Sequence, residues 1–345
     1  MNVAVFYAPK RIEIEERPTP KVGPHEVLVQ IGACGICGTD LHIFAGEAHA
    51  RPPVILGHEF AGTVVEVGKE VRDLHLGDKV AVDPNIACGG CYYCHRGQVN
   101  FCENLRALGV DIDGGFAEFC LAPAKQCYKL PADFPLEFGA FAEPLSCCIR
   151  GLERSAIQPG QSVAIVGAGN IGLLMLQLAR LAGAGAIFVL DPLESKRAIA
   201  RQLQVDLALD SRHPEAVKEI AERTHGGCDV VIECAGNAEA AELAFALTKR
   251  GSRVVLFGLA PPEAYARLYL QAAFLKELTI VSSILNPFTF HTAVALLMRG
   301  KIDLTPFSIN RFGIAEIAKA LDSTRQGLAI KTLVIPNGSA GALRA

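Results

Sequence analysis

A glycine-rich turn between two apolar stretches constrains the fold of this chain most strongly. Gly167, Gly169 and Gly172 form a GxGxxG pattern that follows the apolar stretch 162–166 and opens an apolar, helix-type stretch. Asp191 ends the next apolar stretch, about twenty residues further on. Glycine-rich turns alone are common, but this context is the one that a dinucleotide-binding strand–helix–strand unit requires.

The residues of this turn predict how a dinucleotide would be held. The glycines permit a tight turn and a close approach of the backbone to a pyrophosphate at the helix N-terminus, where Asn170 and Ile171 begin the helix. Asp191 would accept hydrogen bonds from the adenosine ribose hydroxyls, and its charge would repel a 2′-phosphate. The pattern therefore favours NAD over NADP, although Lys196 and Arg197 beyond it leave NADP open.

The hydrophobic pattern divides the chain into two domains. Up to about residue 150, short β-type runs are broken by Gly and Pro, which predicts a compact, mostly antiparallel domain. From about residue 162, apolar strands alternate with helical segments, one of them expected over 242–249, which predicts an α/β doubly wound parallel sheet. We expect a first domain over 1–150, to which the tail over 285–345 returns, around a dinucleotide-binding domain over 151–284; residues 337–345 show no pattern.

Composition excludes several classes of protein. The chain has 345 residues and a formal net charge of −3, too mild for a nucleic-acid footprint or a membrane patch. Its first residues turn charged too early for a secretory signal, and no apolar run is long enough for a membrane span. We therefore expect a cytoplasmic protein without nucleic-acid or membrane partners, whose 12 cysteines point to metal rather than to disulfides.

Four cysteines lie close together in one segment of the chain. They are Cys88, Cys91, Cys94 and Cys102. Four thiolates suit tetrahedral, closed, structural zinc, and the alternative is an iron–sulfur cluster. A site filled by protein ligands cannot bind substrate, so its expected role is to brace a surface lobe.

A second set of ligand-type residues is spread along the chain. It comprises Cys37, His58, Glu59 and Glu143. One Cys, one His and one or two carboxylates can hold zinc and leave a position for water or substrate, as catalytic zinc requires. Spacing alone does not establish this site, because a single His is more often a loop residue and Glu143 could be a helix-start carboxylate.

Taken together, these motifs resemble the zinc-containing medium-chain dehydrogenase/reductase family. The resemblance runs from residues 27–42 through 57–68, the four-cysteine segment, 114–119, 142–147 and 166–172. Gly57-His58-Glu59 together with Glu143-Pro144-Leu145-Ser146 is similar to the polyol (sorbitol) and threonine dehydrogenase branch. The resemblance implies a GroES-like catalytic domain split around a Rossmann domain, and two zinc ions per chain, one catalytic and one structural.

The resemblance also implies roles for individual residues. Cys37 and His58 would bind the catalytic zinc, Glu59 would be a direct or intermittent ligand, and Glu143 would bind the zinc or a zinc-bound water. Asp40 would orient the ligands from behind. Thr39 and His42 would relay the proton of the alcohol, with the cofactor ribose between them, while hydride passes to the nicotinamide.

The substrate expected from this resemblance is a secondary alcohol of polyol, sugar or diol type, oxidised to a ketone. Animal sorbitol dehydrogenases carry an Arg-Tyr pair where this chain has residues 283–288 without Arg or Tyr, which argues against sorbitol. Threonine dehydrogenases typically have Asp-Pro where this chain has Glu143-Pro144. L-Threonine, a primary alcohol or an aldehyde remains the alternative substrate, a non-catalytic zinc and nucleotide-binding protein is the third hypothesis, and we expect a homo-oligomer, either a dimer or a tetramer.

Overall fold

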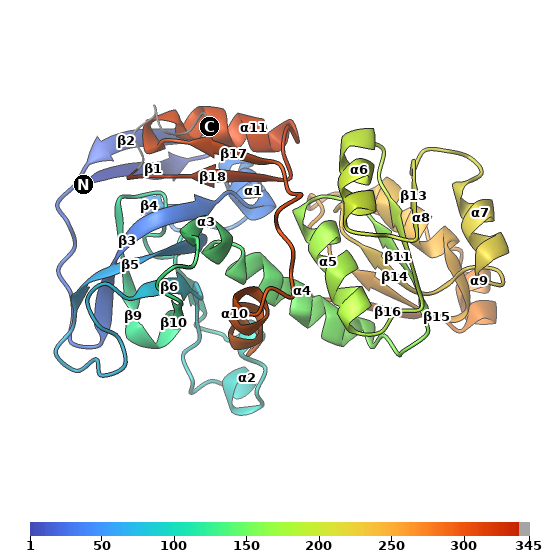
Figure 1. The fold of residues 1–345 in the computed structure, drawn as a ribbon, viewed down its shortest axis with the longest axis horizontal. Helices are drawn as coiled ribbons and strands as arrows, with labels where there is room; N and C mark the ends of the chain where they lie inside the picture. Colours follow the sequence, from blue (N-terminus) through green and yellow to red (C-terminus); the bar gives the residue numbers. More distant parts are fainter. Residues whose placement is uncertain (338–345) are drawn as a thin grey trace. The chain divides into compact units, whose positions relative to one another are not determined.

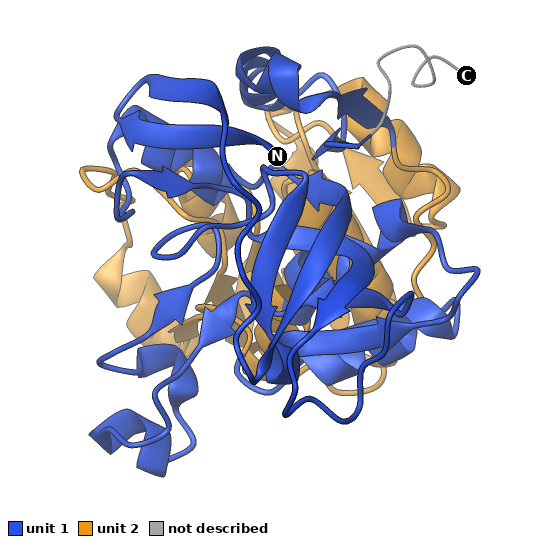
Figure 2. Cartoon of the chain, turned by 90° about the vertical axis from the view of Figure 1, so that its left-hand side faces the viewer, with its two compact units in different colours: residues 1–146, 287–301, 308–345 blue, residues 147–286, 302–307 orange. Residues whose placement is uncertain are grey.

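The computed structural model describes residues 1–337 and forms two compact units (Figures 1 and 2). Unit 1 comprises residues 1–146, 287–301 and 308–345, and unit 2 comprises residues 147–286 and 302–307. Residues 338–345, within the segment predicted to lack a pattern, lie outside the described residues. Asn337, which begins that segment, is held in place, because its side-chain amide donates hydrogen bonds to the carbonyls of Ile31 and Glu118.

Unit 2 contains one six-stranded sheet in which every pairing is parallel. The strand order is β13-β12-β11-β14-β15-β16, so the chain reverses its direction of travel between β11 and β14. In such a sheet, ligands bind beyond the carboxyl ends of the strands at the reversal point. The strands are β11 (Ser162–Val166), β12 (Ala186–Leu190), β13 (Leu207–Leu209), β14 (Cys228–Glu233), β15 (Thr248–Leu256) and β16 (Thr279–Ser282).

Helices pack on the sheet of unit 2 and bury an apolar core against it. Helix α5 contacts β11 and β12, and α8 contacts β14 and β15. The predicted α/β fold class, with a doubly wound parallel sheet, is therefore confirmed. The helices are α4 (Ala142–Ser155), whose last part belongs to unit 2, α5 (Asn170–Leu181), α6 (Glu194–Gln202), α7 (Ala216–Arg223), α8 (Ala238–Ala246) and α9 (Leu270–Lys276).

A helix was predicted over 242–249, and the structure places it at Ala238–Ala246 (α8), so both predicted ends are wrong. Helix α8 starts earlier because the Asn237 side chain caps it by accepting a hydrogen bond from the Ala240 amide. It ends at Ala246 because Thr248 already pairs with Cys228 and begins strand β15. A bulge then shifts the register before Arg253, so the strand is longer than its apolar part indicates.

Unit 1 is built from β-strands and is mostly antiparallel, as predicted. Its largest sheet has the order β10-β6-β5-β3-β18-β17, with β9 also paired to β3, and only β17 and β18 are parallel. A three-stranded sheet and a two-stranded ladder complete the unit. The strands are β1 (Asn2–Ala8), β2 (Arg11–Glu16), β3 (Glu26–Gly35), β4 (Val54–Ile55), β5 (Glu59–Val67), β6 (Lys79–Val82), β7 (Asn85–Ile86), β8 (Arg106–Ala107), β9 (Phe119–Pro123), β10 (Cys127–Leu130), β17 (Ile309–Phe312) and β18 (Lys331–Val334).

The last strands of the chain complete the sheet of the first residues. Strand β18 pairs with β3, so the C-terminal segment joins unit 1, and alternate residues of β3, such as Val27, Val29 and Ile31, are buried in its core. No helix of the described part of the chain is long and apolar enough to cross a membrane. The short helices of this unit are α1 (Gly38–Ala45), α2 (Tyr92–His95), α3 (Leu136–Gly139), α10 (Phe290–Met298), α11 (Ile317–Arg325) and the 3-10 turns η1 (Val99–Phe101), η2 (Ala124–Gln126) and η3 (Ile314–Glu316).

Residues 302–307 belong to unit 2 although they follow α10. The buried side chain of Gln177 on α5 holds them, because it accepts a hydrogen bond from the Asp303 amide (2.6 Å) and donates one to the Asp303 carbonyl (3.1 Å). Ile302, Leu304 and Phe307 of this segment are also buried, so the Gln177 amide does not act alone. The predicted domain boundaries at 151 and 284 stay predictions.

Candidate functional site

Three ligand-type side chains from two elements meet in unit 1. Cys37 caps the N-terminus of α1, Glu59 is the first residue of β5, and His58 directly precedes that strand. One ligand atom of each lies within 4.8 Å of the others, and the His and Glu side chains are buried. The antiparallel register brings them together, because Gly35, two residues before Cys37, pairs with Glu59. A thiol, an imidazole and a carboxylate at these separations form a donor set that fits zinc.

Asp40 lies behind this group and orients it. Its carboxylate accepts a hydrogen bond from the Cys37 amide (2.8 Å), and its other oxygen lies 3.5 Å from Nδ1 of His58. Oδ1 of Asp40 and Nδ1 of His58 are buried and have no hydrogen-bond partner. An Asp facing one ring nitrogen leaves the other for a metal, as in carboxylate–histidine–metal pairs. Burial alone would lower the pKa of His58, but Asp40 outweighs it and the net shift is upward, so the pocket favours positive charge.

Glu143 and an unpredicted residue, Lys331, lie near this group. Glu143 is buried in the first turn of α4 and is not among the three residues within 4.8 Å, but its charge acts on Lys331. Lys331 begins β18, and its ammonium makes a buried ion pair with Glu59. Although burial lowers the pKa of Lys331, the charges of Glu59, Cys37 and Glu143 raise it above its usual value. No motif in the sequence marks this residue.

The two predicted relay residues occupy the same helix, α1. The Thr39 hydroxyl oxygen lies 3.7 Å from the sulfur of Cys37 and accepts a hydrogen bond from its S–H group. Nδ1 of His42 lies 2.7 Å from a carboxylate oxygen of Glu47. Thr39 therefore sits beside a candidate ligand, whereas His42 is turned toward an exposed carboxylate one turn further along the chain.

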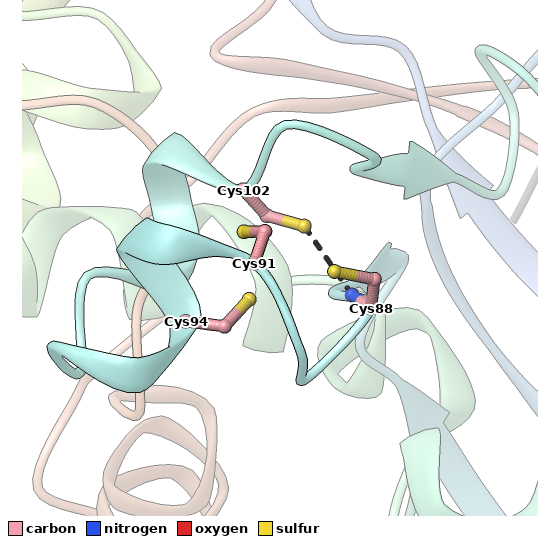
Figure 3. Close-up of side chains that lie close together, drawn as sticks. All are labelled: Cys88, Cys91, Cys94 and Cys102. Atoms are coloured by element: carbon pink, nitrogen blue, oxygen red, sulfur yellow. Dashed lines mark hydrogen bonds between the residues drawn. The ribbon is translucent and has the colours of Figure 1, made fainter.

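The four cysteines of the second group converge in one loop of unit 1 (Figure 3). Their sulfur atoms all lie within 4.8 Å of one another, and the Cys88 amide donates a hydrogen bond to the sulfur of Cys102 (3.3 Å). The short elements α2 and η1 hold three of these residues, since Cys91 precedes α2, Cys94 lies in it and Cys102 follows η1. Four sulfur atoms at these separations fit a closed tetrahedral metal site.

Backbone amides around this group stabilise thiolates. The Gly90 amide and the Cys102 thiol lower the pKa of Cys88 to about 6, and amides of Cys94 and Glu103 lower the pKa of Cys91. Burial, together with hydrogen bonds to the neighbouring thiols of Cys91 and Cys102, raises the pKa of Cys94 to about 12. Four sulfurs that cannot all be charged without a cation between them support a metal site rather than four independent thiols.

The glycine turn of unit 2 has the geometry expected of a pyrophosphate cradle. Gly167 begins the turn, directly after β11, with φ of +102°, a conformation that favours glycine. A Cβ on Gly169 would point into open space, whereas a Cβ on Gly172 would lie 1.7 Å from the Gly167 carbonyl. Helix α5 begins at Asn170, directly after Gly169, so its N-terminal amides are available to an anion.

Asp191 is buried at the carboxyl end of β12, close to the glycine turn. One carboxylate oxygen accepts a hydrogen bond from the Ala168 amide and the other from the Leu193 amide, each at 2.8 Å. Two nearby arginines are turned to other partners. Arg197 donates to the Asp191 carbonyl (2.6 Å) and pairs with Glu194, and Arg212 pairs with Asp210, whose pKa it lowers to about 2.

Asn170 and Ile171 complete the predicted cofactor-binding residues. The side-chain oxygen of Asn170 is buried without a hydrogen-bond partner, and the Ile171 carbonyl lies 3.9 Å from the sulfur of Cys148. The structure therefore brings all six predicted cofactor residues to one end of the sheet in unit 2. It brings Cys37, His58 and Glu59 together in unit 1, with Asp40 and Thr39 in contact.

Comparison with known proteins agrees with both units. Residues 23–132 match the model of the alcohol dehydrogenase GroES-like domain, and residues 170–299 match that of the zinc-binding dehydrogenases. L-Threonine 3-dehydrogenase from Pyrococcus furiosus is 37% identical over 323 residues, covering 91% of this chain and 92% of the relative. Sorbitol dehydrogenase from Bombyx mori is 33% identical over 340 residues, covering 96% and 97%.

A solved structure resembles the whole chain. It is described as a zinc-binding dehydrogenase from Sinorhizobium meliloti 1021 bound to NADP, and it superposes with a TM-score of 0.93 at 40% identity, covering 97% of this chain and 99% of the other. The expectation of a GroES-like domain beside a Rossmann-type domain is confirmed.

Proposed function

Because the chain belongs to the zinc-containing medium-chain dehydrogenase/reductase family, we propose that it is an NAD-linked enzyme that oxidises a secondary alcohol to a ketone. The observation that carries this proposal is the group formed by Cys37, His58 and Glu59, with the Thr39 hydroxyl 3.7 Å from the Cys37 sulfur. Catalytic zinc binds about four ligands, so a site with only three protein ligands leaves one position for a substrate oxygen. A proton-accepting hydroxyl stands beside it.

Two zinc ions per chain are part of this proposal. Cys37 and His58 would bind the catalytic ion, with a carboxylate from Glu59 or Glu143 as the third ligand. The four cysteines of the loop at 88–102 would bind a structural ion. Two of these ligands, Cys88 and Cys91, have pKa values that backbone amides lower, which supports zinc there.

The residues of the site would divide the work of the reaction. Bound zinc would supply Lewis acidity that makes the alcohol more acidic, and bound NAD would accept hydride from the carbinol carbon. Thr39 would take the hydroxyl proton and pass it outward, and His42 would receive it near the surface, where Glu47 can stabilise the added charge. Asp40 would hold the Cys37 backbone and the His58 ring in place.

NAD is the proposed cofactor, in preference to NADP. The Asp191 carboxylate is fixed at the end of β12 by two amides, where it can accept hydrogen bonds from ribose hydroxyls and repel a phosphate. The arginines that could attract a phosphate, Arg197 and Arg212, are paired with Glu194 and Asp210. The NADP in the Sinorhizobium structure is that protein's ligand, so cofactor preference needs direct measurement.

The substrate class is a secondary alcohol of polyol, sugar or diol type. A second candidate is L-threonine, which also carries a secondary hydroxyl and is favoured by the 37% identity to a relative named L-threonine 3-dehydrogenase. Both substrates would use the same zinc, relay and cofactor chemistry. They differ in charge, since an amino acid needs partners for its ammonium and carboxylate groups.

The experiment that tests this function is a substrate panel followed at 340 nm. Zinc-loaded protein is mixed with NAD and, separately, with polyols, sugar acids, vicinal diols, L-threonine, simple primary alcohols and aldehydes. Formation of NADH with one class of secondary alcohol supports the proposal and identifies the substrate class. NADH formation only with primary alcohols or aldehydes, or with none of the panel, would contradict it.

A further inference from the structure

Lys331 is a buried lysine at the edge of the candidate metal group. Lys331 is only 4% exposed. Its ammonium contacts Oε2 of Glu59 and donates a hydrogen bond to the Ile36 carbonyl (3.2 Å). Ile36 directly precedes Cys37. The lysine therefore touches one candidate ligand and the backbone beside another, from a position far along the chain.

The strands are arranged to accommodate this ion pair. Strand β3 lies between β5 and β18, and its Gly35 pairs with Glu59 on one side and with Leu333 on the other. A Cβ on Gly35 would lie 2.3 Å from Oε2 of Glu59 and 2.6 Å from Cε of Lys331. The absence of a side chain at Gly35 thus provides the space in which the ammonium and the carboxylate meet.

The ammonium of Lys331 also neutralises the buried carboxylate of Glu59. In the described part of the chain, Lys331 is the ion-pair partner of Glu59, and the charges of Cys37 and Glu143 also act on it. A buried carboxylate that loses its cation carries a large desolvation penalty, so it moves toward another cation if one is within reach. Beside Glu59, that other cation would be a zinc ion held by Cys37 and His58.

We propose that Lys331 is a positioning residue which holds one oxygen of Glu59, so that this carboxylate has only its other oxygen for zinc and a position stays open for the alcohol. The inference rests on the proposed function and deepens it. Without Lys331, both oxygens of Glu59 would be free to bind the metal. The added oxygen would hold the ion more firmly and would fill the position that the alcohol needs.

The test removes the ammonium and keeps the length of the side chain. For Lys331→Met in the full-length protein, we expect the first zinc to be released to a chelator more slowly than in the wild type. We also expect the visible spectrum of the cobalt-substituted protein to change, because the number of oxygen ligands changes. The kcat should fall about 10- to 100-fold, as is typical when a residue behind a metal ligand is replaced.

Three further variants make the result decisive. Lys331→Arg keeps the charge and should retain the wild-type cobalt spectrum. In a Glu59→Gln background, Lys331→Met should change zinc release little, because it acts through Glu59. If Lys331→Met does not fold, Lys331→Gln gives the same test, since it keeps a donor for the Ile36 carbonyl and removes only the charge.

The opposite outcome is equally clear. Faster zinc release in Lys331→Met, with the cobalt spectrum and kcat of the loaded protein unchanged, would show that Lys331 only supports the strands and would overturn the proposal. Wild-type protein that binds no chelator-labile metal would instead refute the proposed function. The two failures are therefore distinguishable.

Discussion

At the scale of single residues, replacing Thr39 tests the proposed proton relay separately from zinc binding. Its hydroxyl lies beside the Cys37 sulfur, but Thr39 itself is not needed to hold zinc. Thr39→Val keeps the shape and removes the hydroxyl, so kcat should fall by about 10² to 10⁴ while the zinc content stays unchanged. Thr39→Ser, which keeps a hydroxyl, should retain most activity. A kcat for Thr39→Val within about two-fold of the wild type would show that the relay is assigned wrongly.

Asp191 is expected to decide between the two dinucleotides. Asp191→Ser should weaken NAD binding and reduce the preference for NAD, because it removes the charge that opposes a 2′-phosphate. The measurement is kcat/KM with NAD and NADP. Asp206→Ser is the matched control, since Asp206 also accepts a backbone hydrogen bond from β12, at Ile187 (2.7 Å). Equal kcat/KM for both cofactors in the wild type would contradict the assignment.

The residues of the site differ in how far the sequence could reveal them. Cys37, His58 and the four loop cysteines belong to local motifs, and their positions relative to one another follow from strand register. Lys331 has no such motif. It reaches Glu59 because β18 pairs with β3, and that long-range pairing is not encoded in any short stretch of sequence. The contact between Asp40 and His58 was predictable in part. The resemblance implied that Asp40 orients the ligands, but only the structure gives the distance of 3.5 Å between Oδ1 of Asp40 and Nδ1 of His58.

At the scale of elements, the loop that carries Cys88, Cys91, Cys94 and Cys102 has little regular structure of its own. Between residues 88 and 102 the only regular elements are α2 and η1, and the short strands β7 and β8 flank the loop. Structural zinc would therefore contribute directly to the stability of this lobe. Cys91→Ser should release one zinc per chain and lower the melting temperature, because three thiolates cannot hold the ion as firmly.

The catalytic constants distinguish this structural role from a chemical one. For the Cys91→Ser protein that remains folded, kcat should change little, because the proposed chemistry occurs at Cys37 and His58. Cys127→Ser, at a cysteine outside both metal groups, should keep the full zinc content. Unchanged stability with a complete loss of kcat would mean that the four-cysteine site takes part in the reaction.

At the scale of the whole molecule, the predicted homo-oligomer directs attention to one surface of unit 2. Strand β16 pairs only with β15 among the described strands, so its other edge is open. Helix α9 nearby exposes large apolar side chains, among them Phe274, which is 82% exposed. An open strand edge beside an apolar patch is typical of an interface between identical subunits.

The predicted homo-oligomer can be tested on this surface. Phe274→Asp should lower the mass measured by sedimentation velocity at a fixed protein concentration, because it places a charge in the expected interface. Leu76→Asp is the matched control, since Leu76 is a similarly exposed apolar residue in unit 1 (69%). A wild-type protein that sediments as a monomer would contradict the expectation of an oligomer.

The general architecture could be read from periodicity because strands and helices alternate regularly from residue 162 onward. The predicted bounds of α8 were wrong because Asn237 caps the helix early, through a local hydrogen bond that a hydrophobic pattern does not record. The hydrogen bonds between Gln177 and Asp303 join segments far apart in the sequence, which periodicity does not record either.

The most direct test of the account is a zinc titration read against activity. The protein is treated with increasing amounts of chelator, and zinc per chain and NADH formation are measured on the same samples. We predict two zinc ions per chain at the start, and activity that falls in proportion to the first ion lost and reaches zero when one remains. Iron in place of zinc would contradict the assignment of two zinc ions, and full activity with a single remaining zinc would contradict the assignment of Cys37 and His58 as the catalytic metal site.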